Sequence, residues 1–238
     1  MDHRTDRLSR MRETLARVGI IATRTRGMLP TEFQVPKRKV QVMQNRTPGA
    51  IGCYASQYNV MCETLRQGKH AFVMEDDLVF CEDFHKRMEY MTCFFETHTW
   101  DVLWLGGTFH VNPPYWHTQD LRRDAECTDD PRVMRTYGAF STHAYIVNKN
   151  SLQRILILLD DWMERSMGID WSFIQFQPSI YAYAFVPGCV IQYDNQSDIG
   201  RGMTRFSGFA KLGPYWFQPK MEDFDPEKFD WHEAHRRI

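Results

Sequence analysis

The sequence predicts an α/β fold with a mainly parallel central sheet flanked by helices. Short apolar runs of strand length alternate with amphipathic helical segments along the chain, and no repeat interrupts this alternation. A length of 238 residues is enough to bury one sizeable core. In such a sheet, ligands gather outside the carboxyl ends of the strands.

The composition excludes several classes of protein. Hydrophobic residues make up 43% and charged residues 25%, which is ordinary for a globular domain, and no apolar run reaches the roughly 20 residues that span a bilayer. The net charge of -1 argues against a general polyanion binder. We therefore expect a protein without a transmembrane segment, located in the cytoplasm, or in the host cytoplasm if the source is a virus.

Charge is unevenly spread along the chain. Residues 1–39 hold ten Lys/Arg against four Asp/Glu, a net of +6, whereas residues 222–238 hold three against six, a net of -3. The basic N-terminal region could meet phosphates or form a solvated helix face.

The six cysteines contain no C-x-x-C pair, so reduced thiols are a simpler expectation than a zinc site or disulfides.

The first half of the chain predicts three helices and three strands. Residues 5–18 carry an apolar stripe, with Thr5 as N-cap and Gly19 just past the end; residues 19–27 then form a short strand. A second helix begins at Thr47 and Pro48 and ends at Gly68. The strand 70–74, a helix over 83–96 and the strand 100–107 follow.

The second half continues the alternation. Residues 108–135 are expected to be a long loop, followed by a strand at 140–148 and a helix at 151–165 capped by Asn150. A short aromatic helix at 171–176 and a last strand at 181–192 complete the pattern. We expect one domain over residues 1–213 and an aromatic, acidic extension over 214–238 that packs on it.

Three consecutive acids directly follow the apolar strand "HAFVM". Side chains alternate along an extended segment, so Glu75 and Asp77 should face the same way and Asp76 the other. Two convergent carboxylates repel each other unless a cation lies between them. Their hard oxygen ligands suit Mg²⁺ or Mn²⁺. A metal site is one interpretation of this acid triplet, and a solvated turn is the other.

Asp170 is the second candidate. The segment "MGIDWSF" places this single acid between an apolar helix and an aromatic segment, a partly dry setting that suits a general base. The alternative is an N-cap for a helix that begins at Trp171. His143 lies within an expected strand, where a buried structural histidine is more common than a metal ligand.

Several segments in order resemble glycosyltransferase family 25. The resemblance is carried by "DHRTDRLSRMRETLARVGI", "TPGAIGCYASQYNVMCETLRQG", "HAFVMEDDLVF", "WDVLWLGG", "HAYIVNKNSLQRIL", "GIDWSF" and "QYDNQSDIG". It implies a GT-A type nucleotide-sugar-binding fold and an enzyme that uses Mn²⁺ or Mg²⁺ to move a sugar from a nucleotide sugar to an acceptor hydroxyl.

The resemblance also implies roles for individual residues. Glu75-Asp76-Asp77 would be the family's form of the DxD motif, with Asp77 and Glu75 on the metal. Asp170 would take the acceptor's proton in an inverting reaction. The residues expected near the nucleotide sugar, besides Glu75 and Asp76, are Arg4, Arg7, Gly52 and Ser56.

The chain departs from the family pattern in three places. The family opens with an apolar strand, whereas this sequence starts at Met1-Asp2, and its Ser-His helix motif has Gln at position 57. The late histidine often found on the metal in GT-A folds has no counterpart, because no His occurs between 144 and 231. Asp194 or a water is the expected substitute.

Three functions are therefore weighed. The first is a metal-dependent, inverting glycosyltransferase that moves a hexose, with a UDP-linked donor expected and galactosyltransferases among the relatives. The second is a metal-dependent phosphate-ester hydrolase or nuclease, and the third is a non-catalytic nucleotide-sugar-binding module. The acceptor stays open among a glycan, a lipid-linked glycan, a protein and a modified nucleic acid, and a homodimer stays open as the assembly.

Overall fold

The structure is a computed structural model that describes residues 4–29, 32, 47–109, 125–130, 132–163, 168–193, 195–196 and 203–204. The expected extension over 214–238 lies outside these residues, as do residues 110–124 of the expected loop and the proposed substitute ligand Asp194. The division into a domain over 1–213 and an extension stays a prediction. Among the described helices, none is both long and apolar enough to cross a membrane.

The main sheet has six strands in the order β1-β6-β3-β7-β5-β4. The strands are β1 (Ala71–Met74), β3 (Val102–Phe109), β4 (Ala125–Cys127), β5 (Val133–Thr136), β6 (Ala139–Val147) and β7 (Ala182–Phe185). Two short ribbons are separate from it: β2 (Leu78–Phe80) pairs with β8 (Val190–Gln192), and β9 (Asn195–Gln196) pairs with β10 (Met203–Thr204).

The prediction of a mainly parallel sheet is wrong for the described pairings. Only β3 and β7 pair in parallel; the other four pairings in the sheet are antiparallel. Because β6 runs antiparallel to both β1 and β3, the strands β1, β3 and β7 still point the same way, as helical crossovers require. The antiparallel members β4 and β5 come from the segment expected to be a loop, and β6 enters between β1 and β3.

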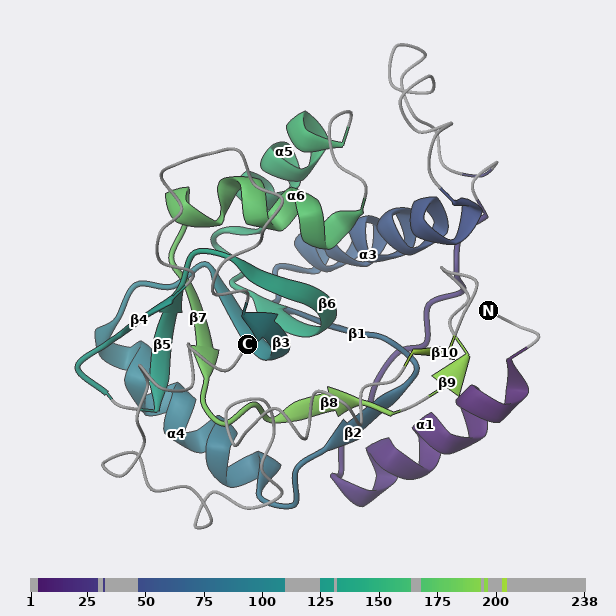
Figure 1. Ribbon diagram of the computed structural model, residues 1–238, viewed down its shortest axis with the longest axis horizontal. Helices are drawn as coiled ribbons and strands as arrows, with labels where there is room; N and C mark the ends of the chain where they lie inside the picture. Colours follow the sequence, from purple (N-terminus) through teal and green to yellow (C-terminus); the bar gives the residue numbers. More distant parts are fainter. Residues whose placement is uncertain are drawn as a thin grey trace.

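Helices cover both faces of the sheet, as expected (Figure 1). The helices α3 (Pro48–Gln67), α5 (Leu152–Trp162) and α6 (Ile169–Phe176) pack on one face, and a 3-10 turn at Gln177–Ser179 follows α6. The helices α1 (Thr5–Arg17) and α4 (Phe84–Thr97) lie on the side of the second core cluster, with the β2–β8 ribbon. Successive side chains of β3 point to opposite faces of the sheet, so Trp104 belongs to the first core cluster and Leu103 to the second.

The helix boundaries follow local signals with two corrections. Thr47 accepts a hydrogen bond from the backbone N–H of Ala50, so the cap expected for α3 is confirmed. Thr5 is the first residue of α1 rather than its cap, and α5 begins after Ser151 rather than Asn150. The Ser151 hydroxyl instead donates to the buried Asp101 carboxylate, 2.5 Å away.

The end of α1 has the expected glycine. Gly19 takes a φ of 63°, and the N–H groups of Gly19 and Ile20 donate to the carbonyls of Ala16 and Leu15. This pair of bonds is a Schellman motif, which terminates the helix and turns the chain. The strand expected over 19–27 does not form: residues 20–29 run without a strand partner in the described structure. Residues 22–25 instead line a cavity that Phe72, Val73 and Met74 of β1 also line.

Candidate active site

The acid triplet lies in the connection between β1 and β2, at the carboxyl end of β1. The backbone N–H of Glu75 donates to the carbonyl of His143 on β6 at 2.8 Å, and the N–H of Tyr193 donates to the carbonyl of Asp77 at 3.0 Å. Both the main sheet and the β2–β8 ribbon therefore fix the backbone of the triplet. The sequence predicted the candidate site at this position, where three acids follow the end of a strand.

Glu75 and Asp77 face a common partner, as the alternation predicted. The side-chain amide nitrogen of Gln192 donates to Glu75 Oε2 and to Asp77 Oδ1, each at 3.0 Å. Asp76 differs from both: its side chain is 43% exposed, and it accepts a hydrogen bond from Arg7. The two carboxylates that converge are thus the ones proposed for the metal.

A second amide holds the other oxygen of Glu75. Gln57 Nε2, on α3, donates to Glu75 Oε1 at 3.2 Å, and the same nitrogen lies 3.3 Å from the carbonyl and hydroxyl oxygens of Thr142. The hydroxyl of Tyr145 donates to Gln57 Oε1 at 2.9 Å, which fixes the orientation of the amide. Gln57, which departs from the family pattern, therefore contacts the acid triplet directly.

Arg7 is the cation of the triplet rather than a lining residue of the cavity. Its guanidinium lies 2.7 Å from Asp76 Oδ1 and 3.5 Å from Asp77 Oδ2, and the side chain is 9% exposed. It neutralises one negative charge where three carboxylates gather. Asp170 adds a fourth acid, close enough to contribute to the pKa of Glu75.

The electrostatic result is a site short of positive charge. Burial, followed by the nearby carboxylates of Asp77, Asp170 and Asp76, raises the pKa of Glu75 to about 8 against the opposing effect of Arg7. Burial, partly offset by the hydrogen bond from the backbone N–H of Trp171, also raises the pKa of Asp170 to about 6. Both groups are destabilised as anions, which is the condition under which a bound cation stabilises a carboxylate site.

Asp170 is the second residue of α6, and Gly168 is its N-cap, so the N-cap interpretation of Asp170 is wrong. Its Oδ1 accepts a hydrogen bond from the N–H of Trp171 at 2.9 Å. No side chain among the described residues forms a hydrogen bond with the other carboxylate oxygen, so a role in proton transfer is compatible with this geometry.

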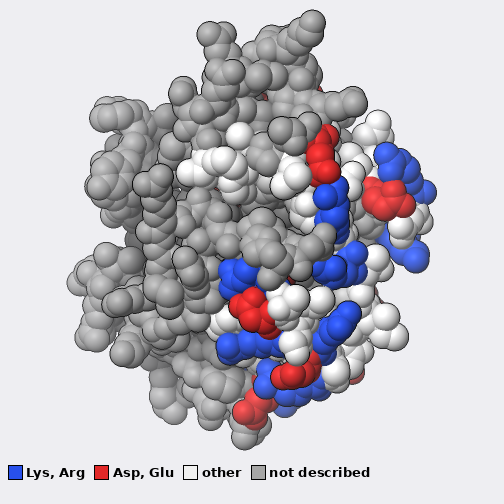
Figure 2. Space-filling model, turned by 90° about the vertical axis from the view of Figure 1, so that its right-hand side faces the viewer, with Lys and Arg blue, Asp and Glu red and all other residues white. Residues whose placement is uncertain are grey.

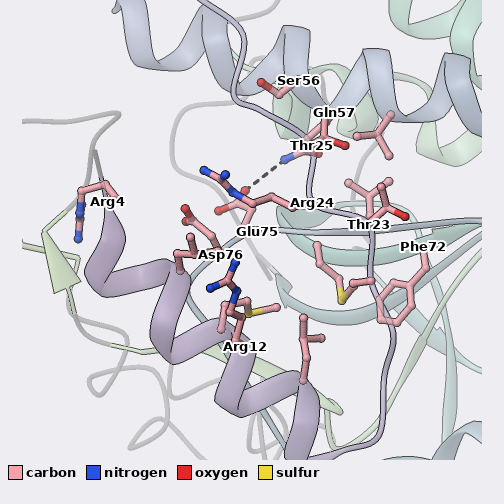
Figure 3. A pocket seen from close by; sticks show the side chains of 17 residues that line it. Arg4, Arg12, Thr23, Arg24, Thr25, Ser56, Gln57, Phe72, Glu75 and Asp76 are labelled. Carbon is pink, nitrogen blue, oxygen red and sulfur yellow. Dashed lines mark hydrogen bonds between the residues drawn. The ribbon is translucent and has the colours of Figure 1, made fainter. Parts of the chain in front are cut away.

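A cavity of about 400 Å³ adjoins the triplet. Its polar part gathers side chains from four segments: α1, residues 22–25, α3 and the end of β1 (Figure 3). The polar and charged lining residues are Arg4, Arg12, Thr23, Arg24, Thr25, Ser56, Gln57, Glu75 and Asp76. The remainder of the wall is apolar and comes from α1, α3, Ala22 and β1. A volume of this size lies within the range of small-molecule sites.

The residues expected near a nucleotide sugar divide into two groups. Arg4, Ser56, Glu75 and Asp76 line the cavity, whereas Arg7 and Gly52 are not among its lining residues. Gly52 instead allows residues 20–29 to cross α3, because a Cβ at this position would lie 2.7 Å from the carbonyl oxygen of Met28. Ser56 helps to hold the same crossing, since its hydroxyl accepts a hydrogen bond from the N–H of Met28 at 2.8 Å.

The side chains at the triplet supply part of the coordination that a hard cation needs. No three Asp, Glu, His or Cys side chains of the described residues form a complete metal-binding group. Magnesium sites, however, commonly use one or two carboxylates and complete their coordination with water and substrate phosphates. Glu75 and Asp77 supply two such carboxylates that already share one donor. His143 is buried, and its Nε2 lies 3.4 Å from the Val190 carbonyl oxygen.

Replacing Arg7 with Met is expected to destabilise the protein by about 3 kcal/mol, because two carboxylates would lose their buried cationic partner. Denaturant unfolding measures this change. Arg66→Met is the matched control: the Arg66–Glu63 pair is 70% and 56% exposed, and surface pairs contribute about 0–1 kcal/mol. Equal losses in the two variants would contradict the role of Arg7.

Sequence reasoning missed two members of this site, Gln192 and Tyr145. It named Arg7 as a residue near the nucleotide but not its contacts with Asp76 and Asp77. The signal for Gln192 was its place at the end of the last expected strand, next to the carboxyl end of the acid-bearing strand. No pattern in the sequence indicates that β2 and β8 pair with each other.

Comparison with known proteins gives one family. The model of glycosyltransferase family 25, described as LPS biosynthesis protein, matches residues 2–172. That range includes Arg4, Arg7, the acid triplet and Asp170, and it ends before β7 and β8. No curated protein matches the chain significantly.

Proposed function

This chain belongs to glycosyltransferase family 25 and is thereby a glycosyltransferase, and from that premise we propose a metal-dependent, inverting transfer of a hexose from a nucleotide sugar, with UDP as the expected nucleotide. The observation that supports it is the convergence of Glu75 and Asp77 beside a cavity whose wall holds several arginines. The family favours transfer over the hydrolase and binding-module alternatives.

The nucleotide sugar would bind at the polar part of the cavity. Arg4, Arg12 and Arg24 offer positive charge for a diphosphate, and Ser56 offers a hydroxyl group. Residues 4–29 hold seven arginines against two acids, a net of +5. Figure 2 shows the side of the molecule where α1 lies. Basic side chains cluster on the described part of this surface, with acidic side chains between them. Such a field favours the approach of an anionic donor.

Glu75 and Asp77 would hold Mn²⁺ or Mg²⁺. When bound, this ion would neutralise the diphosphate as it leaves with the electron pair of its bond to the sugar. The contribution of the chain is to keep both carboxylates in place before the ion arrives. Gln57, Tyr145 and the two backbone hydrogen bonds of the triplet do this.

Asp170 would act as the general base. The acceptor hydroxyl gives its proton to the Asp170 carboxylate while its oxygen forms a bond to C1 of the sugar, and the bond from C1 to the diphosphate breaks on the opposite face. Burial suits this role because a carboxylate with a pKa of about 6 accepts a proton more readily than one with an ordinary pKa, yet is largely ionised at neutral pH.

The function is tested by incubating the full chain with Mn²⁺ and a panel of nucleotide sugars and measuring the free nucleoside diphosphate. We expect slow donor hydrolysis without an acceptor, and faster release once a hydroxyl acceptor is supplied. The panel includes UDP-, GDP- and CMP-linked sugars, so it also identifies the nucleotide. No release from any donor, together with no thermal stabilisation by any nucleotide, would refute the proposal.

A further inference from the structure

Gln192 lies beside both Glu75 and Asp77, next to the place that a cation shared by the two carboxylates would take. It is the last residue of β8, and the pairing of Leu78 with Gln192 in the β2–β8 ribbon fixes its position beside the triplet. Its amide nitrogen is 3.0 Å from one oxygen of each carboxylate. The amide nitrogen thus bridges two carboxylates that otherwise repel each other.

The two amides of the site differ in what holds their oxygen atoms. Gln57 Oε1 accepts a hydrogen bond from Tyr145, so turning the Gln57 amide would break that bond. Gln192 Oε1 has no hydrogen-bond partner among the described residues. A half-turn of the Gln192 amide would therefore bring its oxygen, an acceptor, to the place of its nitrogen, a donor. The turn would break only the two hydrogen bonds to the carboxylates. Amide oxygens are ordinary ligands of hard cations.

We propose that Gln192 is the third protein ligand of the cation, through its side-chain oxygen. This inference rests on the proposed function, which supplies the ion. It explains how a cation could be held although no three Asp, Glu, His or Cys side chains of the described residues form a metal-binding group: a carboxamide from β8 supplies the third ligand. Without the ion, the nitrogen of the same amide holds the two carboxylates together.

Calorimetric titration of the full chain with Mn²⁺ alone tests the proposal. Gln192→Ala removes the ligand, and we expect its dissociation constant for Mn²⁺ to rise at least about tenfold. Gln192→Glu keeps an oxygen at this position and adds a charge, so it should bind Mn²⁺ at least as tightly as the unaltered chain. Gln67→Ala is the matched control, since Gln67 is exposed at the end of α3 and, among the described residues, its side chain bonds only to Glu63.

Mn²⁺ binding by Gln192→Ala that equals or exceeds that of the unaltered chain would overturn the proposal, as would weakened binding by Gln192→Glu. Thermal unfolding without metal checks that each variant is folded. If Gln192→Ala does not fold, the Mn²⁺ affinity of Gln192→Glu alone tests the proposal. If the unaltered chain releases nucleoside diphosphate but binds no Mn²⁺, the ligand assignment fails while sugar transfer stands. If Mn²⁺ binding depends on Gln192 but no donor is consumed, the proposed function fails instead.

Discussion

Asp77→Asn is expected to lower the rate of sugar transfer at least about a hundredfold. Asn has nearly the same size as Asp and can still accept a hydrogen bond from Gln192, but it lacks the negative charge. Asp77 is 4% exposed and faces Glu75 across one amide group, so no other carboxylate among the described residues occupies the same place. The loss should therefore appear in metal-dependent turnover rather than in folding.

The measurement is the release of nucleoside diphosphate at saturating Mn²⁺ and donor, with thermal unfolding as the check on folding. Glu63→Gln removes an exposed acid of α3 that pairs with Arg66 and is expected to leave the rate unchanged. A rate for Asp77→Asn within a few fold of the unaltered chain would exclude Asp77 from the cation site.

Asp170→Asn is expected to keep donor binding and to lower transfer about 10²- to 10⁴-fold, the usual contribution of a general base. The pH dependence gives an independent readout. Only the ionised carboxylate accepts a proton, and burial raises the pKa of Asp170 to about 6. Transfer by the unaltered chain at saturating Mn²⁺ should therefore increase as the pH rises through about 6.

In Asp170→Asn this increase should disappear while the nucleotide still binds. The ratio kcat/KM measured from pH 5 to 8 checks the first expectation, and calorimetry with the nucleotide checks the second. Asp161→Asn, an exposed acid in α5, is the control and should retain both the rate and the pH profile. An unchanged rate in Asp170→Asn would show that another group accepts the proton.

The sequence predicted the elements better than their pairing. The capping signals at Thr47 and Gly19 and the apolar runs placed α3, the end of α1, β1 and β3 correctly, because these signals are local. The insertion of β6 between β1 and β3 depends on pairs of residues that lie between 30 and 76 positions apart, which alternation along the chain does not encode. The segment 19–27 has strand composition, yet no described strand pairs with it.

The candidate site was predicted in part for the same reason. The convergence of Glu75 and Asp77 follows from the geometry of any extended segment, so the spacing alone indicated it. The partners of these acids come from α1, α3, β6 and β8, and only the fold brings Arg7, Gln57, Tyr145 and Gln192 to them. Gly52 was placed near the donor by family resemblance, whereas its lack of a side chain is required for packing against Met28.

The most direct test of the cation-dependent donor site is the binding of UDP measured by calorimetry in the presence of Mn²⁺ and after its removal by a chelator. We expect the unaltered chain to bind UDP with Mn²⁺ and chelation to weaken this binding at least about tenfold. Asp77→Asn should bind UDP weakly in both conditions. Equal UDP affinity with and without the metal, or no UDP binding in either condition, would contradict the assignment of Glu75 and Asp77 to a cation that holds the diphosphate.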